Sequence, residues 1–161
     1  MSFDDLRDLY QDVILDHGRR PRHGARLENF DATAKGDNPM CGDRVQVWVK
    51  YAPDHTIADT GFEARGCAIS IASADLMAET VQGKSPADTK ALFDAFRDMV
   101  RTGICPDCAR LAEPLDRLKP LSGVHEYPSR VKCATLAWHA LQEALEKPLA
   151  KGAELSIEDE L

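Results

Sequence analysis

The sequence lacks the features that direct a chain into or across a membrane. None of its apolar runs approaches the roughly 18 residues that a membrane-spanning helix needs. The first five residues, Met1-Ser2-Phe3-Asp4-Asp5, turn acidic at once and contain no apolar signal core. We therefore expect no membrane partner and a cytoplasmic location.

An excess of positive charge is also missing. The chain has 20 lysines and arginines against 27 aspartates and glutamates, which gives a formal net charge of −7. Because binding to phosphate backbones requires a basic surface, this balance argues against nucleic acid as the main partner. The hydrophobic content of 43% and the charged content of 29% are typical of a folded globular protein.

The 161 residues contain no internal repeat and no linker that would divide them. This length suits one domain with a hydrophobic core of its own. We predict a single domain over residues 1–150, followed by an acidic tail over residues 151–161.

Apolar periodicity predicts one helix, then strands, then further helices. Helical spacing runs from Leu6 to Ile14. Four apolar residues from Val45 to Tyr51 then alternate with Arg44, Gln46, Trp48 and Lys50, as in a half-buried antiparallel strand. We expect a return strand over residues 56–64 and a shorter strand near residues 31–35.

The second half of the chain is predicted to be helical. Helices are expected over residues 69–82, from the Ser85-Pro86 start to Gly103, and from Pro128 to Pro148, with an irregular stretch over residues 104–124 that holds a short helix around Leu115 to Leu118. This order predicts an α+β fold, a small three-stranded antiparallel sheet with helices packed on one face.

Five cysteines are present, and an odd number fits a disulfide framework poorly. In a reducing compartment they are better interpreted as metal ligands or reactive thiols. Cys41, Cys67 and Cys133 are widely separated, and each lies beside features that favour an exposed sulfur. Cys67 and Cys133 are each expected at the start of a helix, where the pKa of a thiol is lowered.

Three thiolates and the nearby carboxylate of Asp43 are enough for a tetrahedral metal site. The hairpin brings Cys41 and Cys67 to one edge of the sheet, and the last helix could direct Cys133 to the same edge. The alternative is that these cysteines simply pack in the core, as buried cysteines often do.

A further pair, Cys105 and Cys108, forms a C-x-x-C motif with no second such motif to complete a four-cysteine site. It could be a loop clip, a redox or sulfur-relay pair, or part of a second metal site with His125 as the nearest third ligand. Either cysteine could also replace Asp43 in the first site. We favour Asp43, because a single glycine ties it to Cys41.

Three motifs together resemble those of the iron–sulfur cluster assembly proteins of the IscU/NifU-N-terminal type. They are Met40-Cys41-Gly42-Asp43, Gly66-Cys67-Ala68-Ile69-Ser70 and Val131-Lys132-Cys133, and the similarity covers about residues 3–147. Within this family the chain looks most like the SufU branch. It has an extra stretch over about residues 84–120, and Lys132 stands where the IscU branch usually has a histidine.

This resemblance implies a zinc-dependent sulfurtransferase that accepts persulfide sulfur from a SufS-type cysteine desulfurase and serves downstream iron–sulfur assembly proteins. The implied zinc ligands are Cys41, Asp43, Cys67 and Cys133, with Cys41 also the sulfur acceptor. The alternative is a scaffold on which iron is assembled into a [2Fe–2S] cluster. Arg130 and Lys132 could pair with a ligand, or could equally be ordinary surface residues at a helix start.

Overall fold

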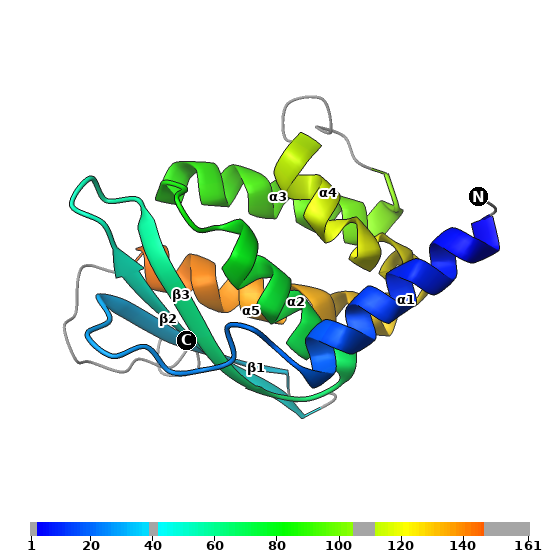
Figure 1. Cartoon of the computed structure of the whole chain (residues 1–161), viewed down its shortest axis with the longest axis horizontal. Coiled ribbons are helices and arrows are strands. Elements are labelled where there is room, and N and C mark those ends of the chain that lie inside the picture. Colours follow the sequence, from blue (N-terminus) through cyan, green and yellow to red (C-terminus); the bar gives the residue numbers. More distant parts are fainter. Residues whose placement is uncertain (1–2, 39–41, 105–111, 147–161) are drawn as a thin grey trace.

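The computed structural model describes residues 3–38, 42–104 and 112–146, and it has a layer of helices on a small sheet (Figure 1). The α+β fold predicted from the sequence is confirmed. In chain order the elements are α1 (Phe3–Arg19), β1 (Ala32–Asn38), β2 (Asp43–Tyr51), β3 (Ile57–Arg65), α2 (Ala68–Thr80), α3 (Pro86–Thr102), α4 (Ala112–Leu118), the 3-10 helix η1 (Lys119–Glu126) and α5 (Pro128–Glu146).

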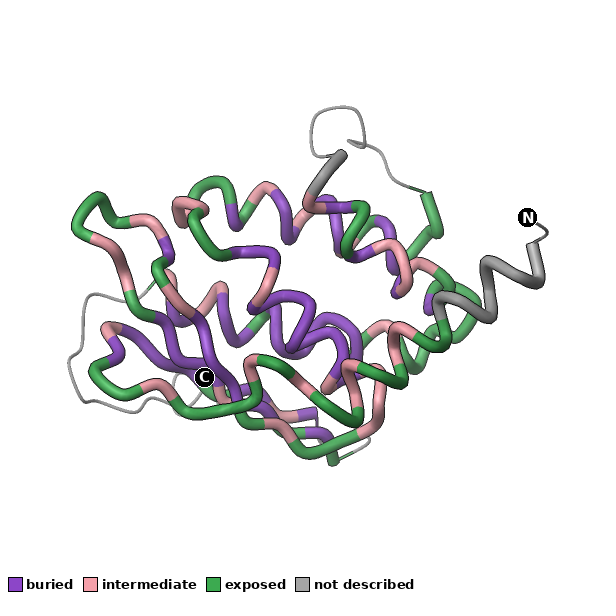
Figure 2. Tube along the Cα trace, viewed as in Figure 1, coloured by how far each residue is buried: buried purple, intermediate pink, exposed green. Residues whose placement is uncertain are grey.

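The sheet has the order β1-β2-β3, and both pairs of strands are antiparallel. Val47, at the centre of β2, lies opposite Ala34 of β1 and Phe62 of β3, and all three are buried. α5 packs on β1 and β2, while α2 packs on β3 and α5. The buried residues of Figure 2 accordingly concentrate in α2, α5 and the strands beneath them.

The outer face of the sheet is partly covered by the loop that follows α1. Trp48 belongs to the polar phase of the predicted alternation, yet only 1% of its surface is exposed. The Arg26 guanidinium lies 5.8 Å from the centre of the Trp48 ring and 5.9 Å from that of Phe30. Gly61 allows this approach, because a Cβ there would collide with the carbonyl oxygen of Ala25.

The helical half differs from the prediction in one segment. Ser85 caps α3 as expected, since its hydroxyl accepts a hydrogen bond of 3.1 Å from the Asp88 amide. The short helix predicted around Leu115 to Leu118 is present as part of α4, but residues 119–124, predicted to be irregular, belong to η1. Four buried apolar residues hold α4 and η1 against the core, namely Leu115, Leu118, Leu121 and Val124. No helix among the described residues is long and apolar enough to cross a membrane.

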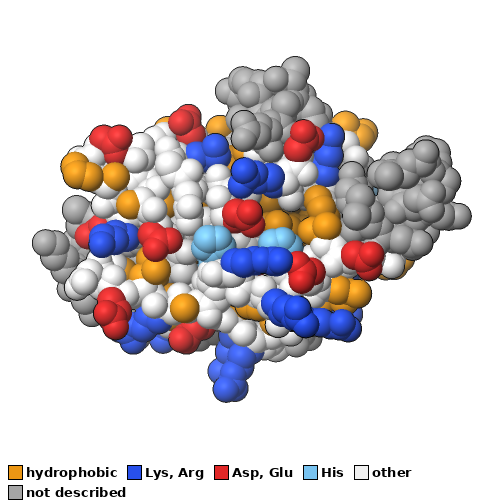
Figure 3. All heavy atoms as spheres, in the orientation of Figure 1, with side chains coloured by type: hydrophobic (Ala, Val, Ile, Leu, Met, Phe, Trp, Pro, Cys, Tyr) orange, Lys and Arg blue, Asp and Glu red, His pale blue; other side chains and the backbone are white. Residues whose placement is uncertain are grey.

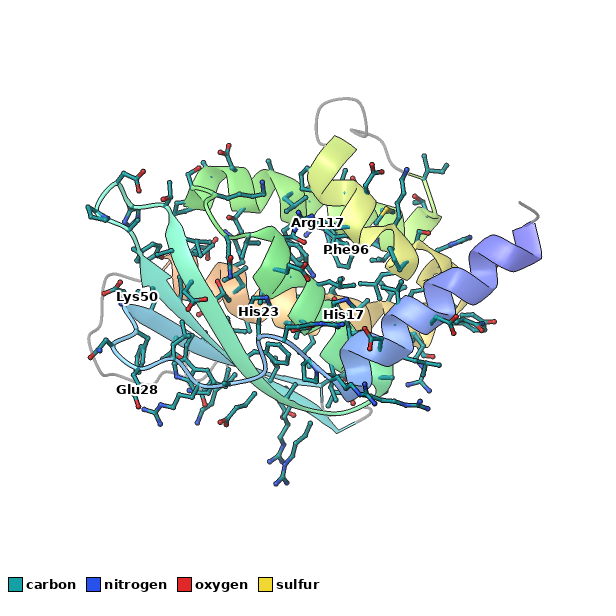
Figure 4. The ribbon with its side chains drawn as sticks, in the orientation of Figure 1. His17, His23, Glu28, Lys50, Phe96 and Arg117 are labelled. Carbon is teal, nitrogen blue, oxygen red and sulfur yellow. The ribbon has the colours of Figure 1, made fainter. Side chains whose placement is uncertain are left out.

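Buried polar contacts fasten the end of α1 to α2. The carboxylate of Asp75 is completely buried, and its two oxygens bind the His17 Nδ1 at 2.5 Å and the His23 amide at 2.8 Å. Figure 4 labels both histidines, which lie beside α2 where α1 ends. Gly18 packs on Ala68 so closely that a Cβ would lie 3.1 Å from the Ala68 carbonyl oxygen. The last turn of α1 therefore sits against the first residue of α2.

Candidate metal centre

Three elements meet where β2 begins, β3 ends and α2 starts. Asp43 is the first residue of β2, and Cys67 is the N-cap of α2. The Cys67 amide donates a hydrogen bond of 3.3 Å to Asp43 Oδ1, and the Cys67 sulfur lies 3.8 Å from Asp43 Oδ2. Cys133 of α5 completes the cluster, and one ligand atom from each of the three residues lies within 4.8 Å of the other two.

Gly66 makes room for the carboxylate in this cluster. A Cβ at residue 66 would overlap the side chain of Asp43, so only glycine leaves the carboxylate in its observed place. Gly42, just before Asp43, has a φ of +76°, a left-handed conformation that glycine adopts without strain. Gly66 was not among the site residues predicted from the sequence. Its position directly before Cys67, a predicted ligand, was the feature of the sequence that could have indicated its role.

The environment of Cys133 differs from the one expected. Cys133 lies in the second turn of α5, five residues after Pro128, and only 1% of its surface is exposed. Burial, followed by hydrogen bonding to Asp43 and the nearby Cys67, raises the pKa of the Cys133 thiol far above its ordinary value. The prediction of an exposed, low-pKa thiol at a helix start was therefore wrong for Cys133. Cys67 does occupy a helix start and is half-buried.

Arg130 belongs to the site, one helical turn before Cys133. Its exposed guanidinium interacts with the thiol of Cys133 and with Cys67, and these contacts raise the pKa of Arg130. Lys132, which is also exposed, lies two residues after Arg130 in α5. A positive charge thus stands next to the sulfur atoms, where it would stabilise their thiolate forms.

The donor set fits a metal ion of the zinc type. Zinc–sulfur bonds of about 2.3 Å and zinc–oxygen bonds of about 2.0 Å, set at a tetrahedral angle, place sulfur and oxygen about 3.5 Å apart. The observed separation of 3.8 Å between Cys67 Sγ and Asp43 Oδ2 is close to this value. Cys67 and Asp43 therefore already have nearly the spacing that one small cation requires, and the Cys133 sulfur lies within 4.8 Å of both.

Three of the predicted site residues lie outside the described residues. They are Cys41, Cys105 and Cys108. In the sequence, Cys41 stands two residues before Asp43. His125, the suggested ligand of the second pair, donates from Nδ1 to the Ser122 carbonyl oxygen at 2.8 Å and packs against Gly103.

The fold and this cluster define a class of protein, a small α+β domain that gathers thiols and a carboxylate at one edge of its sheet. The chain belongs to the family of NifU-like N terminal domains, whose sequence model matches residues 9–134. The family resemblance inferred from the three cysteine motifs is thereby confirmed, and the proteins of this family assemble iron–sulfur clusters.

Curated relatives carry two different functional names. An iron–sulfur cluster assembly scaffold protein IscU of Streptococcus pyogenes serotype M1 is 40% identical over 147 residues, 91% of this chain and 89% of that protein. A zinc-dependent sulfurtransferase SufU of Bacillus subtilis strain 168 is 36% identical over 148 residues, 91% of this chain and 97% of that protein.

A solved structure gives the same picture of the fold. It is a putative iron–sulfur cluster assembly scaffold protein for the SUF system from Fervidobacterium islandicum AW-1. It aligns with a TM-score of 0.74 and 30% identity, over 87% of this chain and 98% of that chain.

Proposed function

We propose that this protein is a zinc-binding sulfur acceptor that takes persulfide sulfur from a cysteine desulfurase and passes it into iron–sulfur cluster assembly. The observation that carries the proposal is the convergence of Asp43, Cys67 and Cys133 within 4.8 Å at the sheet edge that Cys41 precedes. We propose one domain over residues 1–150, in which the inserted residues 84–120 supply α3 to the core.

The residues that would hold the zinc are Cys41, Asp43, Cys67 and Cys133. Zinc has no redox chemistry, so when bound it would hold thiolates without oxidising them. The carboxylate of Asp43 is a poorer ligand for a soft site than a fourth thiolate would be. The site is therefore suited to releasing one ligand, and Cys41, in the segment before β2, is the one we propose to be released.

Sulfur transfer then follows the rules of thiol–disulfide exchange. The freed Cys41 thiolate attacks the terminal sulfur of the desulfurase persulfide, and the bond between the two sulfur atoms of that persulfide breaks. Cys41 gains the sulfur as a new persulfide, and the desulfurase cysteine leaves as a thiolate. No net oxidation occurs, because the sulfur moves between two cysteines. Arg130 would stabilise the thiolates of Cys67 and Cys133 during the exchange.

The second candidate function is a scaffold for a [2Fe–2S] cluster. It is favoured by the 40% identity to a protein named as an IscU scaffold and by a donor set that also suits iron. Lys132 and the insert over residues 84–120 favour the sulfurtransferase, because both are the features by which the chain resembles the SufU branch.

Mass spectrometry after incubation with a SufS-type desulfurase and cysteine tests the proposal. We expect one added sulfur on Cys41, none in the variant Cys41→Ala, and normal loading in the matched control Cys105→Ala. Absence of added sulfur on wild-type Cys41 would refute the proposal. Metal analysis of the purified protein separates the two candidate functions. The sulfur acceptor should contain about one tightly bound zinc, whereas the scaffold should form an iron–sulfur cluster after anaerobic reconstitution.

A further inference from the structure

Exposed basic side chains gather around the metal centre, although the chain as a whole carries a net charge of −7. They come from the end of α1, from the ends of two strands and from α5. We call them the basic rim, which consists of Arg19, Arg20, Arg44, Arg65 and Lys132. In the space-filling view, several lysine and arginine side chains project from the lower edge of the molecule (Figure 3).

Two members of the rim face each other directly. Arg44 of β2 is the cross-strand partner of Arg65 of β3, on the outer face of the sheet. Like charges at such positions destabilise a sheet. Asp37 lies 3.7 Å from Arg44 and offsets part of this repulsion, yet 76% of the Arg44 side chain remains exposed. The Arg44–Arg65 pair therefore does not stabilise the sheet, and its exposed charge is available to bind a negatively charged partner.

The other members are placed by contacts already described. Gly18 packs on Ala68, so Arg19 and Arg20 follow directly beside the start of α2. Lys132 is the residue before Cys133 on α5. The rim thus reaches the metal centre from three directions.

An exposed aromatic side chain also lies beside the metal centre. Tyr127 is 61% exposed, and its carbonyl oxygen accepts a hydrogen bond of 2.7 Å from the Arg130 amide. An exposed aromatic side chain with a charged margin is typical of a protein–protein interface.

We propose that the basic rim docks the metal centre onto an acidic patch of the sulfur-donating protein. This inference rests on the proposed function, because it assigns the charge of the surface around the donor persulfide. A protein fits better than a nucleic acid, since the net charge of −7 repels a long polyanion, while a compact acidic patch meets only the rim. Rim charges of this kind mainly speed association and make it sensitive to salt.

The test compares two double charge reversals that change the net charge equally. The rim variant is Arg44→Glu with Arg65→Glu, and the control is Lys50→Glu with Lys90→Glu, at exposed positions outside the rim. Affinity for the desulfurase is measured by fluorescence anisotropy at about 50 and about 300 mM salt. We expect the rim variant to bind about tenfold more weakly at low salt and to lose most of the salt dependence, and the control to stay within about twofold.

Equal weakening in both variants, or wild-type binding that does not depend on salt, would overturn the basic-rim proposal. Tight binding of a duplex DNA probe that the rim variant loses would also overturn it, in favour of nucleic acid. Sulfur loading of Cys41 at saturating desulfurase separates the two proposals. Wild-type loading combined with binding that the rim variant does not weaken would overturn the basic-rim proposal alone, whereas rim-dependent binding without any loading of Cys41 would overturn the proposed function alone.

Discussion

The two halves of α5 show how one helix can both support a site and belong to it. In the second half, the ring of Trp138 stacks on Phe93 and Phe96 with ring centres 5.9 and 4.8 Å apart. In the first half, a buried thiol with a raised pKa stands one turn from an exposed arginine. The first half of α5 buries the polar thiol of Cys133, whose burial apolar packing alone does not offset. The aromatic packing of the second half holds the helix, and with it Cys133, in place.

The comparison implies that mutations in the two halves should separate stability from metal binding. Changes near Trp138 should lower the free energy of unfolding and leave the metal site intact in the folded molecules. Changes around the site should remove the metal and leave the fold.

The largest effect is expected from removing a ligand. Cys67→Ala deletes one of the two described sulfur donors, and we expect zinc affinity to fall by about 100-fold or more. Zinc content and competition with a chromogenic chelator measure the loss, and circular dichroism checks the helices. Cys105→Ala serves as the matched control and should retain its metal. Stoichiometric zinc in Cys67→Ala would show that Cys67 is not a ligand.

Trp138→Ala should have the next largest effect, on stability. It removes a fully buried indole from its stack with two phenylalanines, which should lower the free energy of unfolding by about 3–5 kcal/mol. Urea unfolding followed by circular dichroism gives this value. The folded variant should still bind zinc in the same ratio as the wild type. If it loses zinc while keeping its stability, the proposed division of α5 is wrong.

The variant Gly66→Ala tests whether the observed position of the Asp43 carboxylate is needed for metal binding. Because the added methyl group would overlap Asp43, the carboxylate must move, and zinc affinity should fall by about 10- to 100-fold. Gly123→Ala is the control, since a Cβ there meets no atom within 4 Å and its φ is not positive. Equal zinc affinities for the two variants would mean that Asp43 does not bind through its observed position.

The smallest effect is a pH dependence of the metal-free protein. The pKa of Cys133 is raised in the folded state above its ordinary value of 9.0, so folding favours the protonated thiol. This contribution to stability is complete below pH 9 and is lost as the pH rises further, because the unfolded chain then ionises first. Urea unfolding at pH 8 and pH 10 should show this loss. The variant Cys133→Ser should lose less stability between pH 8 and pH 10. An equal loss in this variant would mean that other ionisable groups cause the pH dependence.

Local rules were enough to predict the strands and the caps. The alternation from Val45 to Val49 fixes which face of β2 is buried, and Ser85 and Gly103 mark the ends of α3 by their backbone chemistry. The approach of Cys67 to Asp43 could also be predicted, because a hairpin brings its two ends together. These features depend on residues that are close in sequence or joined by one turn.

Features set by distant packing could not be predicted in the same way. Periodicity does not tell which turn of α5 faces the site, so the burial of Cys133 and its raised pKa were missed. Trp48 is buried because Arg26 and its loop cross the outer face of the sheet. Pro114 and Pro120 suggested an irregular segment, yet both lie in the first turn of their helices, where proline is tolerated.

The buried carboxylate of Asp75 has a consequence for the shortest chain that can fold. Its two partners, His17 and the His23 amide, both come from the N-terminal segment. Deleting residues up to 23 would leave a negative charge inside the protein without a donor, which typically destabilises a protein by about 3–5 kcal/mol. The first helix is therefore an integral part of the domain, and versions that begin at the sheet should have a lower free energy of unfolding.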